Sequence, residues 1–106
     1  MSETKFTKGK WSIGSIHNLC VISERKINHV IAECSIDSNM SEKEQLANTK
    51  LIAYAPEMFY RIVLLANSEG WQEAFNLIEK VTGKKYTFNS NEFNVLVKEA
   101  KSYFLA

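Results

Sequence analysis

Two lysines and two aromatic residues lie close together in the last third of the chain: Lys84, Lys85, Tyr86 and Phe88. A flat ring can stack on a nucleobase, and a neighbouring ammonium group can hold a phosphate. This segment is therefore the first candidate for a nucleotide-binding site. The structural alternative is that these rings fill the seam between two helices.

Asn48 and Lys50 form a second candidate pair, because both are polar residues within an otherwise apolar helical segment. Asparagine is a poor helix former, since its amide competes for backbone hydrogen bonds. A contact with a ligand would explain the pair. The alternative is that Asn48 satisfies a carbonyl group at the edge of a sheet.

A third group has the residue types of a zinc site. The spacing is H-x2-C followed by H-x4-C. However, both halves fall on predicted strands rather than on knuckle loops, and alternation along a strand points residues three apart to opposite faces. Buried cysteines also pack as small apolar side chains. The sequence therefore predicts no metal site from the four residues concerned, which are His17, Cys20, His29 and Cys34.

Catalytic motifs are absent from the sequence, which contains no G-x-S-x-G, no S-x-x-K, no P-loop and no dinucleotide fingerprint. Glu42 and Glu44 lie at a predicted helix start, where acidic side chains favour the helix dipole. No acid and base residues converge in the pattern. We therefore expect a binding protein without enzymatic activity and without a cofactor.

The composition is that of one ordinary globular domain, 1–106, with residues 1–9 flexible. The chain has 106 residues, of which 45% are hydrophobic and 24% charged, and a net charge of +1. This charge predicts no non-specific binding to nucleic acid. The longest apolar runs, such as 62–66, are far shorter than the about 20 residues of a membrane span. The polar N-terminus predicts a cytoplasmic protein with reduced cysteines.

The predicted fold class is α+β, with a small antiparallel sheet at residues 11–35 followed by about four helices. Ser41 and Glu44 have the spacing of a capping box at the first helix. Pro56 predicts a bend at Ala55 and the first turn of a new helix. Asn89 is the expected cap of the last helix. The predicted strands are 11–16, 19–23 and 29–35, and the predicted helices are 41–55, 57–67, 70–82 and 90–104.

Helical spacing also predicts which residues are buried. Helix 57–67 is apolar nearly all round, and strand 19–23 is apolar on both faces. These surfaces exceed what so few helices can cover, and they predict a homodimer or a larger homo-oligomer. The predicted buried stripes are Ala47, Leu51, Tyr54 and Ala55; Trp71, Ala74, Phe75, Ile78 and Val81; and Phe93, Leu96, Val97, Ala100 and Phe104.

Residues 47–58, A-N-T-K-L-I-A-Y-A-P-E-M, resemble a family of small phage and prophage proteins that share a pattern close to A-N-A-K-L-I-A-A-A-P-E-L/M. Lys8-Gly9-Lys10-Trp11 corresponds to a P-G-P-W-like start, and Ile31-Ala32-Glu33 to a strand ending in I-A-E. Thr49 and Tyr54 replace alanines, and lysines replace both prolines. The resemblance covers about residues 6–60.

The resemblance implies a phage origin and, by analogy with small phage accessory proteins, a role against host antiviral defence. Two modes follow from that analogy. The first is sequestration of a host-derived nucleotide signal, for which the aromatic and basic residues above are the candidates. The alternative is an anti-CRISPR-like inhibitor that binds a host defence protein complex.

Overall fold

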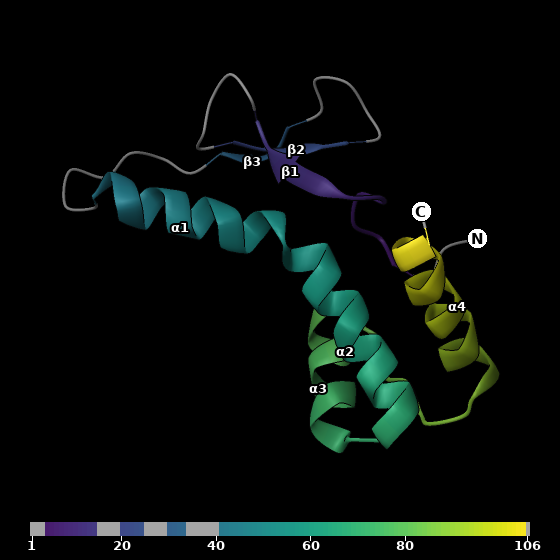
Figure 1. Ribbon diagram of the computed structural model, residues 1–106. Coiled ribbons are helices and arrows are strands. Elements are labelled where there is room, and N and C mark those ends of the chain that lie inside the picture. The colour runs from purple at the N-terminus through teal and green to yellow at the C-terminus, as the bar shows by residue number, and fades with distance from the viewer. Residues whose placement is uncertain (1–3, 15–19, 25–29, 34–40, 106) are drawn as a thin grey trace. The chain divides into compact units, whose positions relative to one another are not determined.

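Three strands followed by four helices make up the described part of the computed structural model, which confirms the predicted α+β class (Figure 1). The structure describes residues 4–14, 20–24, 30–33 and 41–105. The chain divides into two compact units, one formed by residues 1–6 with 57–106 and the other by residues 7–56. The organisation as one domain stays a prediction.

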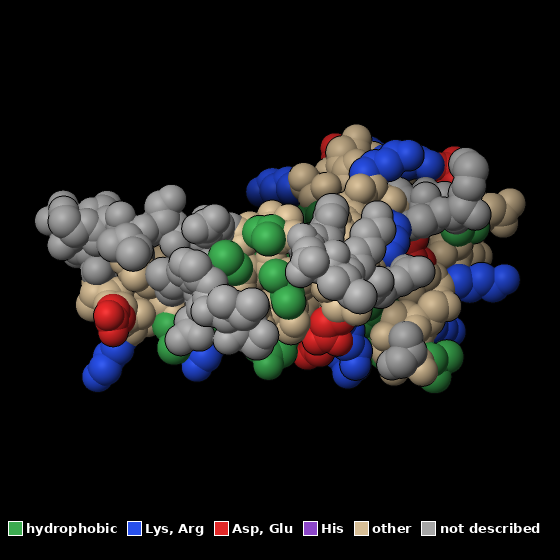
Figure 2. All heavy atoms as spheres, turned by 90° about the horizontal axis from the view of Figure 1, so that it is seen from above, with side chains coloured by type: hydrophobic (Ala, Val, Ile, Leu, Met, Phe, Trp, Pro, Cys, Tyr) green, Lys and Arg blue, Asp and Glu red, His purple; other side chains and the backbone are tan. Residues whose placement is uncertain are grey.

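The first unit along the chain, residues 7–56, holds a three-stranded antiparallel sheet in the order β1-β2-β3. Val21 and Ser23 are buried, whereas Cys20 and Ile22, which alternate with them, are half-buried on the opposite face. The outer face of the sheet is thus apolar, and Figure 2 shows hydrophobic side chains gathered there. The strands are β1 (Trp11–Ile13), β2 (Cys20–Ser23) and β3 (Val30–Glu33).

The pairing of β2 with β3 contains one irregularity. Val21 pairs with Ala32 and Ile22 with Val30, and the irregularity lies between Val21 and Ile22. A bulge adds one unpaired residue to a strand, so the pairing on its two sides differs by one residue from that of an even ladder.

The helix α1 (Glu42–Ala53) begins as predicted, because the Ser41 hydroxyl accepts a hydrogen bond from the Glu44 amide at 3.1 Å. The predicted buried stripe is wrong, however. Ala47, Leu51 and Tyr54 are exposed. The buried residues of α1 are Gln45, Thr49 and Ala53.

Close packing of α1 against the sheet explains why the residues of the predicted stripe are exposed and the opposite face of the helix is buried. The helix α1 lies on β1 and β2, where small side chains such as Ala53 allow the helix backbone to approach. Thr49 is fully buried without an unmet polar group, since its hydroxyl donates to the Gln45 carbonyl at 2.8 Å. A buried hydroxyl that is satisfied within its own helix avoids the cost of desolvation.

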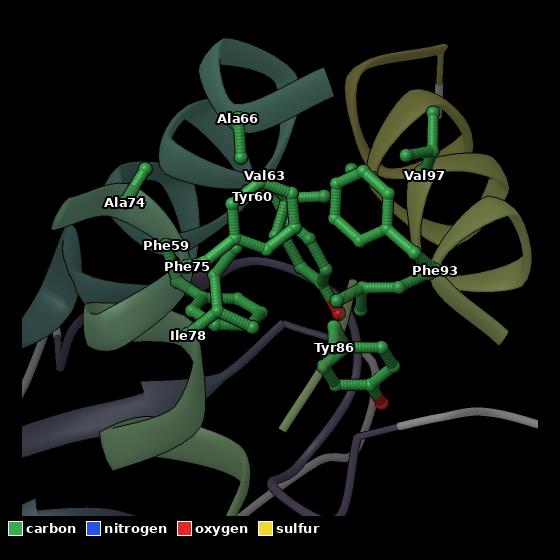
Figure 3. Packing of buried hydrophobic residues seen from close by; sticks show 12 residues of the cluster. Phe59, Tyr60, Val63, Ala66, Ala74, Phe75, Ile78, Tyr86, Phe93 and Val97 are labelled. Carbon is green, nitrogen blue, oxygen red and sulfur yellow. The ribbon is translucent and has the colours of Figure 1, made fainter. Parts of the chain in front are cut away.

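The other unit is built from three helices around an aromatic core (Figure 3). Helix α2 begins after Tyr54 and places the fully buried Pro56 in its first turn, as Pro56 predicts. The helices are α2 (Ala55–Glu69), α3 (Gln72–Thr82) and α4 (Asn91–Leu105). The core consists of Phe59, Tyr60, Val63, Ala66, Ala74, Phe75, Ile78, Tyr86, Phe93, Leu96, Val97 and Ala100.

The predicted stripe of α4 is confirmed at its first four positions, and Phe104 is half-buried with the Arg61 guanidinium 4.1 Å from its ring centroid. The stripe of α3 is confirmed only in its middle. Trp71 and Val81, at its two ends, are each 55% exposed. Both lie beyond the part of α3 that the core cluster covers.

Thr4 and Phe6 contact the helical unit, and the flexibility of residues 1–9 stays a prediction. Thr4 is buried, and its hydroxyl donates to the Glu99 carboxylate. The Phe6 ring lies 5.5 Å from the ring of Phe59 and 5.8 Å from that of Tyr60. The Tyr60 hydroxyl also donates to Glu99, at 2.6 Å. One carboxylate therefore ties the segment to α2 and α4.

This arrangement predicts a loss of stability at alkaline pH. Burial raises the pKa of Tyr60 well above its ordinary value of 10.0, and the hydrogen bond to the Glu99 carboxylate raises this pKa further. The folded unit keeps the proton that unfolded Tyr60 releases near pH 10. Its contribution to stability is therefore complete below pH 10 and falls above it, by about 1.4 kcal/mol per pH unit.

Urea unfolding at several pH values between about 9 and 11 measures this loss. Tyr60→Phe removes the phenol, so its stability should fall less steeply with pH than that of the wild type. Tyr54→Phe, at an exposed tyrosine, is the matched control and should follow the wild type. Equal slopes for all three proteins would contradict the role of Tyr60.

Candidate binding site: an exposed aromatic pair

Phe88 lies at the tip of a tight turn in the connector between α3 and α4. The Ser90 amide donates to the Thr87 carbonyl at 3.2 Å, and Asn89 has φ of 65°. A positive φ at the third position is typical of a type II turn, and asparagine tolerates it. Ser90, rather than the predicted Asn89, then caps α4 by accepting from the Phe93 amide at 3.1 Å. The turn and cap together hold Phe88 in place.

The ring of Phe88 rests on Gly70. A Cβ built on Gly70 would lie 3.8 Å from two atoms of this ring, and φ of Gly70 is 67°. Trp71 follows directly as the N-cap residue of α3, with extended backbone angles. The chain therefore brings together two large aromatic residues that are both more than half exposed, Trp71 at 55% and Phe88 at 52%.

An open hollow of about 440 Å³ is lined by Trp71, Gln72 and Glu73. The Gln72 amide donates to the Asn76 side-chain oxygen at 3.0 Å, which holds the polar wall in place. Pockets of a few hundred Å³ with an aromatic wall and a few polar groups suit small ligands. The site offers stacking surfaces together with amide and carboxylate groups.

The structure separates the four predicted residues of the connector into two groups. Tyr86 is buried with its ring 6.2 Å from that of Phe93, as the structural alternative expects. Lys84 pairs with Glu92 and lies 5.3 Å from the Tyr86 ring centroid. Lys85 and Phe88 are exposed and remain available to a ligand.

The second candidate pair lies in the other unit. Asn48 and Lys50 are both exposed on α1, and the buried polar residues of this helix are Gln45 and Thr49 instead. The pattern of small and polar residues at positions 45, 49 and 53, four apart, is the signal that could have indicated the buried face.

Of the four residues that have the types of a zinc site, the structure describes one. Cys20 is a half-buried free cysteine on β2, and His17, His29 and Cys34 lie outside the described residues. Among the described residues, no group of three His, Cys, Asp or Glu side chains is placed to hold a metal ion.

Trp71 was predicted to be buried, because its spacing fits the apolar stripe of α3, and it was therefore not considered as a candidate site residue. Its position directly after Gly70 was the available signal, since glycine ends the preceding helix and the next residue becomes the N-cap. An N-cap residue has extended backbone angles, so its side chain leaves the helical stripe.

The fold is that of a small α+β protein that exposes two large aromatic residues, Trp71 and Phe88, in its helical unit. The chain belongs to the family of Salmonella phage P22 protein Y8K6, whose family model matches residues 1–93. The match includes both Trp71 and Phe88, and it extends beyond the resemblance seen at residues 6–60. Comparisons with curated proteins and with solved structures gave no match. Of the helices described, none has the length and apolar character to cross a membrane.

Proposed function

We propose that this phage protein is a non-enzymatic binding protein that counters a host antiviral defence by sequestering a nucleotide signal in the host cytoplasm. The observation that supports the proposal is the exposed pair Trp71 and Phe88. Exposed clusters of large apolar side chains on a protein of this size are typical of interaction sites.

The chemistry of the site suits a nucleobase and a phosphate. Each aromatic face can stack a base whatever its sequence identity, and each stack contributes about 1–3 kcal/mol. Lys85, exposed on the same connector, supplies a cation for a phosphate. The amide groups of Gln72 and Asn76 offer donors and acceptors to the edge of a base.

The role against host defence rests on the phage family rather than on the site. Sequestration requires affinity and abundance but no reaction, so it suits a chain whose sequence lacks catalytic motifs. A captured signal is removed from its receptor by mass action.

Titration with a panel of cyclic oligonucleotides and cyclic ADP-ribose isomers tests the proposal. The chain has two tryptophans, so the variant Trp11→Phe leaves Trp71 as the only tryptophan, and its fluorescence reports on the site. A bound base should change this fluorescence and release or absorb heat in calorimetry. The absence of both signals across the panel would contradict nucleotide sequestration.

Single substitutions test which side chains contact the bound nucleotide. Phe88→Ala should weaken nucleotide binding about ten- to a hundredfold, because one base stack is lost. Lys85→Ala should weaken it less at high salt than at low salt, since salt screens a phosphate contact. Val81→Ala is the matched control: it removes an equally exposed apolar side chain at the other end of α3 and should leave affinity unchanged.

An anti-CRISPR-like inhibitor of a host defence complex is the second candidate, and a different surface favours it. Leu77 and Val81 lie one turn apart on α3, and both are exposed. A protein interface spreads over some 20–30 residues on each side, with apolar anchors near its centre. Two neighbouring aliphatic side chains on one helix face could supply such an anchor.

The two candidate functions predict opposite effects of the same substitutions. Capture of a defence complex from host lysate should be lost with Leu77→Glu and kept with Phe88→Ala if the inhibitor function is correct. Nucleotide binding should show the reverse pattern. A defence complex that is captured equally by both variants would contradict the α3 surface.

A further inference from the structure

The open hollow at the start of α3 has an acidic lining. It is lined by Trp71, Gln72 and Glu73, so the Glu73 carboxylate is the one charged group among its described lining residues. An ionised carboxylate accepts hydrogen bonds but donates none, and it repels a phosphate. The hollow therefore suits the base of a nucleotide better than its phosphate, and it favours a base edge that donates hydrogen bonds.

Trp71 is the surface on which such a base can stack. It occupies the N-cap position of α3, where Ser, Thr, Asp and Asn are the favoured residues, and it makes no side-chain capping hydrogen bond. Its side chain is also more than half exposed. Neither capping nor burial in the core accounts for a tryptophan here. Stacking of a flat ligand does, because it requires only an accessible ring face.

The polar groups of the hollow offer a ligand mostly acceptors. Glu73 is exposed and has no hydrogen bond or ion pair with any residue that the structure describes. The Gln72 amide donates to the Asn76 side-chain oxygen at 3.0 Å, so one of its donors is already engaged. The carbonyl oxygen of Gln72 stays open to a donor. The Glu73 carboxylate, with two oxygens, is the strongest acceptor of the set.

Guanine is the nucleobase whose edge matches a carboxylate. Its N1–H and N2–H groups are adjacent donors, which can bind the two carboxylate oxygens as a bidentate pair. Adenine and cytosine each present an amino donor beside a ring nitrogen whose lone pair a carboxylate repels. Uracil presents one donor between two acceptors. Hydrogen bonds to an ionised group are about twice as strong as neutral ones, so this difference discriminates between bases.

We propose that the hollow selects guanine, with the base stacked on Trp71 and its N1–H and N2–H groups donating to the Glu73 carboxylate. The selection of guanine rests on the proposed nucleotide-binding function and names its ligand class, a guanine-containing nucleotide signal. The phosphates of this ligand lie outside the hollow, because the same carboxylate repels them.

Three cyclic dinucleotides with the same sugar–phosphate ring and different bases test this selectivity: cyclic di-GMP, cyclic di-IMP and cyclic di-AMP. Hypoxanthine, the base of cyclic di-IMP, lacks the amino group of guanine and therefore loses one of the two hydrogen bonds. In calorimetric titration of the wild type, cyclic di-IMP should bind about tenfold more weakly than cyclic di-GMP, and cyclic di-AMP about a hundredfold more weakly.

Glu73→Gln keeps the size of the side chain but removes its charge and one acceptor. The affinities of this variant for the three dinucleotides should then differ by less than about threefold. Glu79→Gln, at another exposed acid of α3, is the matched control and should keep the order of the wild type. An acid in the first turn also favours the helix dipole, but that effect on stability does not distinguish one base from another.

Binding of cyclic di-AMP or cyclic di-IMP as tightly as cyclic di-GMP would overturn the selection of guanine and leave nucleotide binding intact. A preference for guanine that Glu73→Gln retains would overturn the role of the carboxylate. Failure of these three ligands and of every other nucleotide in the panel to bind would instead contradict the proposed function itself, and the selection of guanine with it.

Discussion

Removing both exposed rings, with the double variant Trp71→Ala, Phe88→Ala, should abolish nucleotide binding at micromolar protein concentrations. Each lost base stack costs about 1–3 kcal/mol, so the two together lower affinity by roughly a hundredfold or more. The Phe88 ring rests on Gly70, the residue before Trp71. Their effects therefore need not add, and a double-mutant cycle measures their coupling.

Isothermal titration calorimetry gives the affinities for this cycle, since the double variant lacks the fluorescent reporter. Leu77→Ala, Val81→Ala is the matched control, because it removes two exposed apolar side chains from the same helix. Far-UV circular dichroism should be unchanged in both double variants. If the control loses as much affinity as the aromatic double variant, the aromatic pair is not the binding surface.

Phe93→Ala should lower the free energy of unfolding of the three-helix unit by about 3–5 kcal/mol. Phe93 is fully buried, and its ring centroid lies 4.9 Å from that of Phe75 and 6.2 Å from that of Tyr86. Truncation removes these ring contacts and leaves a cavity that the rigid helices can only partly close. A loss of this size is a large fraction of the about 5–15 kcal/mol that stabilises a typical domain.

Urea unfolding of the Trp11→Phe protein measures this effect, because Trp71 then reports on the unit that contains Phe93. Val95→Ala, at an exposed position of α4, is the control and should change stability by less than about 0.5 kcal/mol. A loss below about 1 kcal/mol for Phe93→Ala would show that the ring is not enclosed by the core.

The phenol of Tyr60 and the salt bridge of Lys84 show why side-chain roles escaped the sequence pattern. Both depend on partners that are distant in the sequence or that a connector brings close: Glu99 for Tyr60 and Glu92 for Lys84. Phe88 was predicted as a binding residue, and the structure places it on the surface. Tyr86, two residues away, was predicted with it but is buried.

Local signals were sufficient for the elements of this fold. Alternating apolar residues, the Ser41 cap and Pro56 act through neighbours in the chain, so the order of strands and helices was predictable from residue types alone. The buried stripe of α4 was also predictable from the sequence. This helix has one continuous apolar face, so burying that face is the one favourable arrangement.

Tertiary structure alone decided which face of α1 is buried and which aromatic residues reach the surface. A short distance between helix and sheet favours small side chains over large ones, so Thr49 and Ala53 are buried while Leu51 is exposed. The end of α2 at Glu69 and the turn at Asn89 place Phe88 against Gly70, the residue before Trp71. Such outcomes depend on distances between elements, and residue types along one chain segment do not determine those distances.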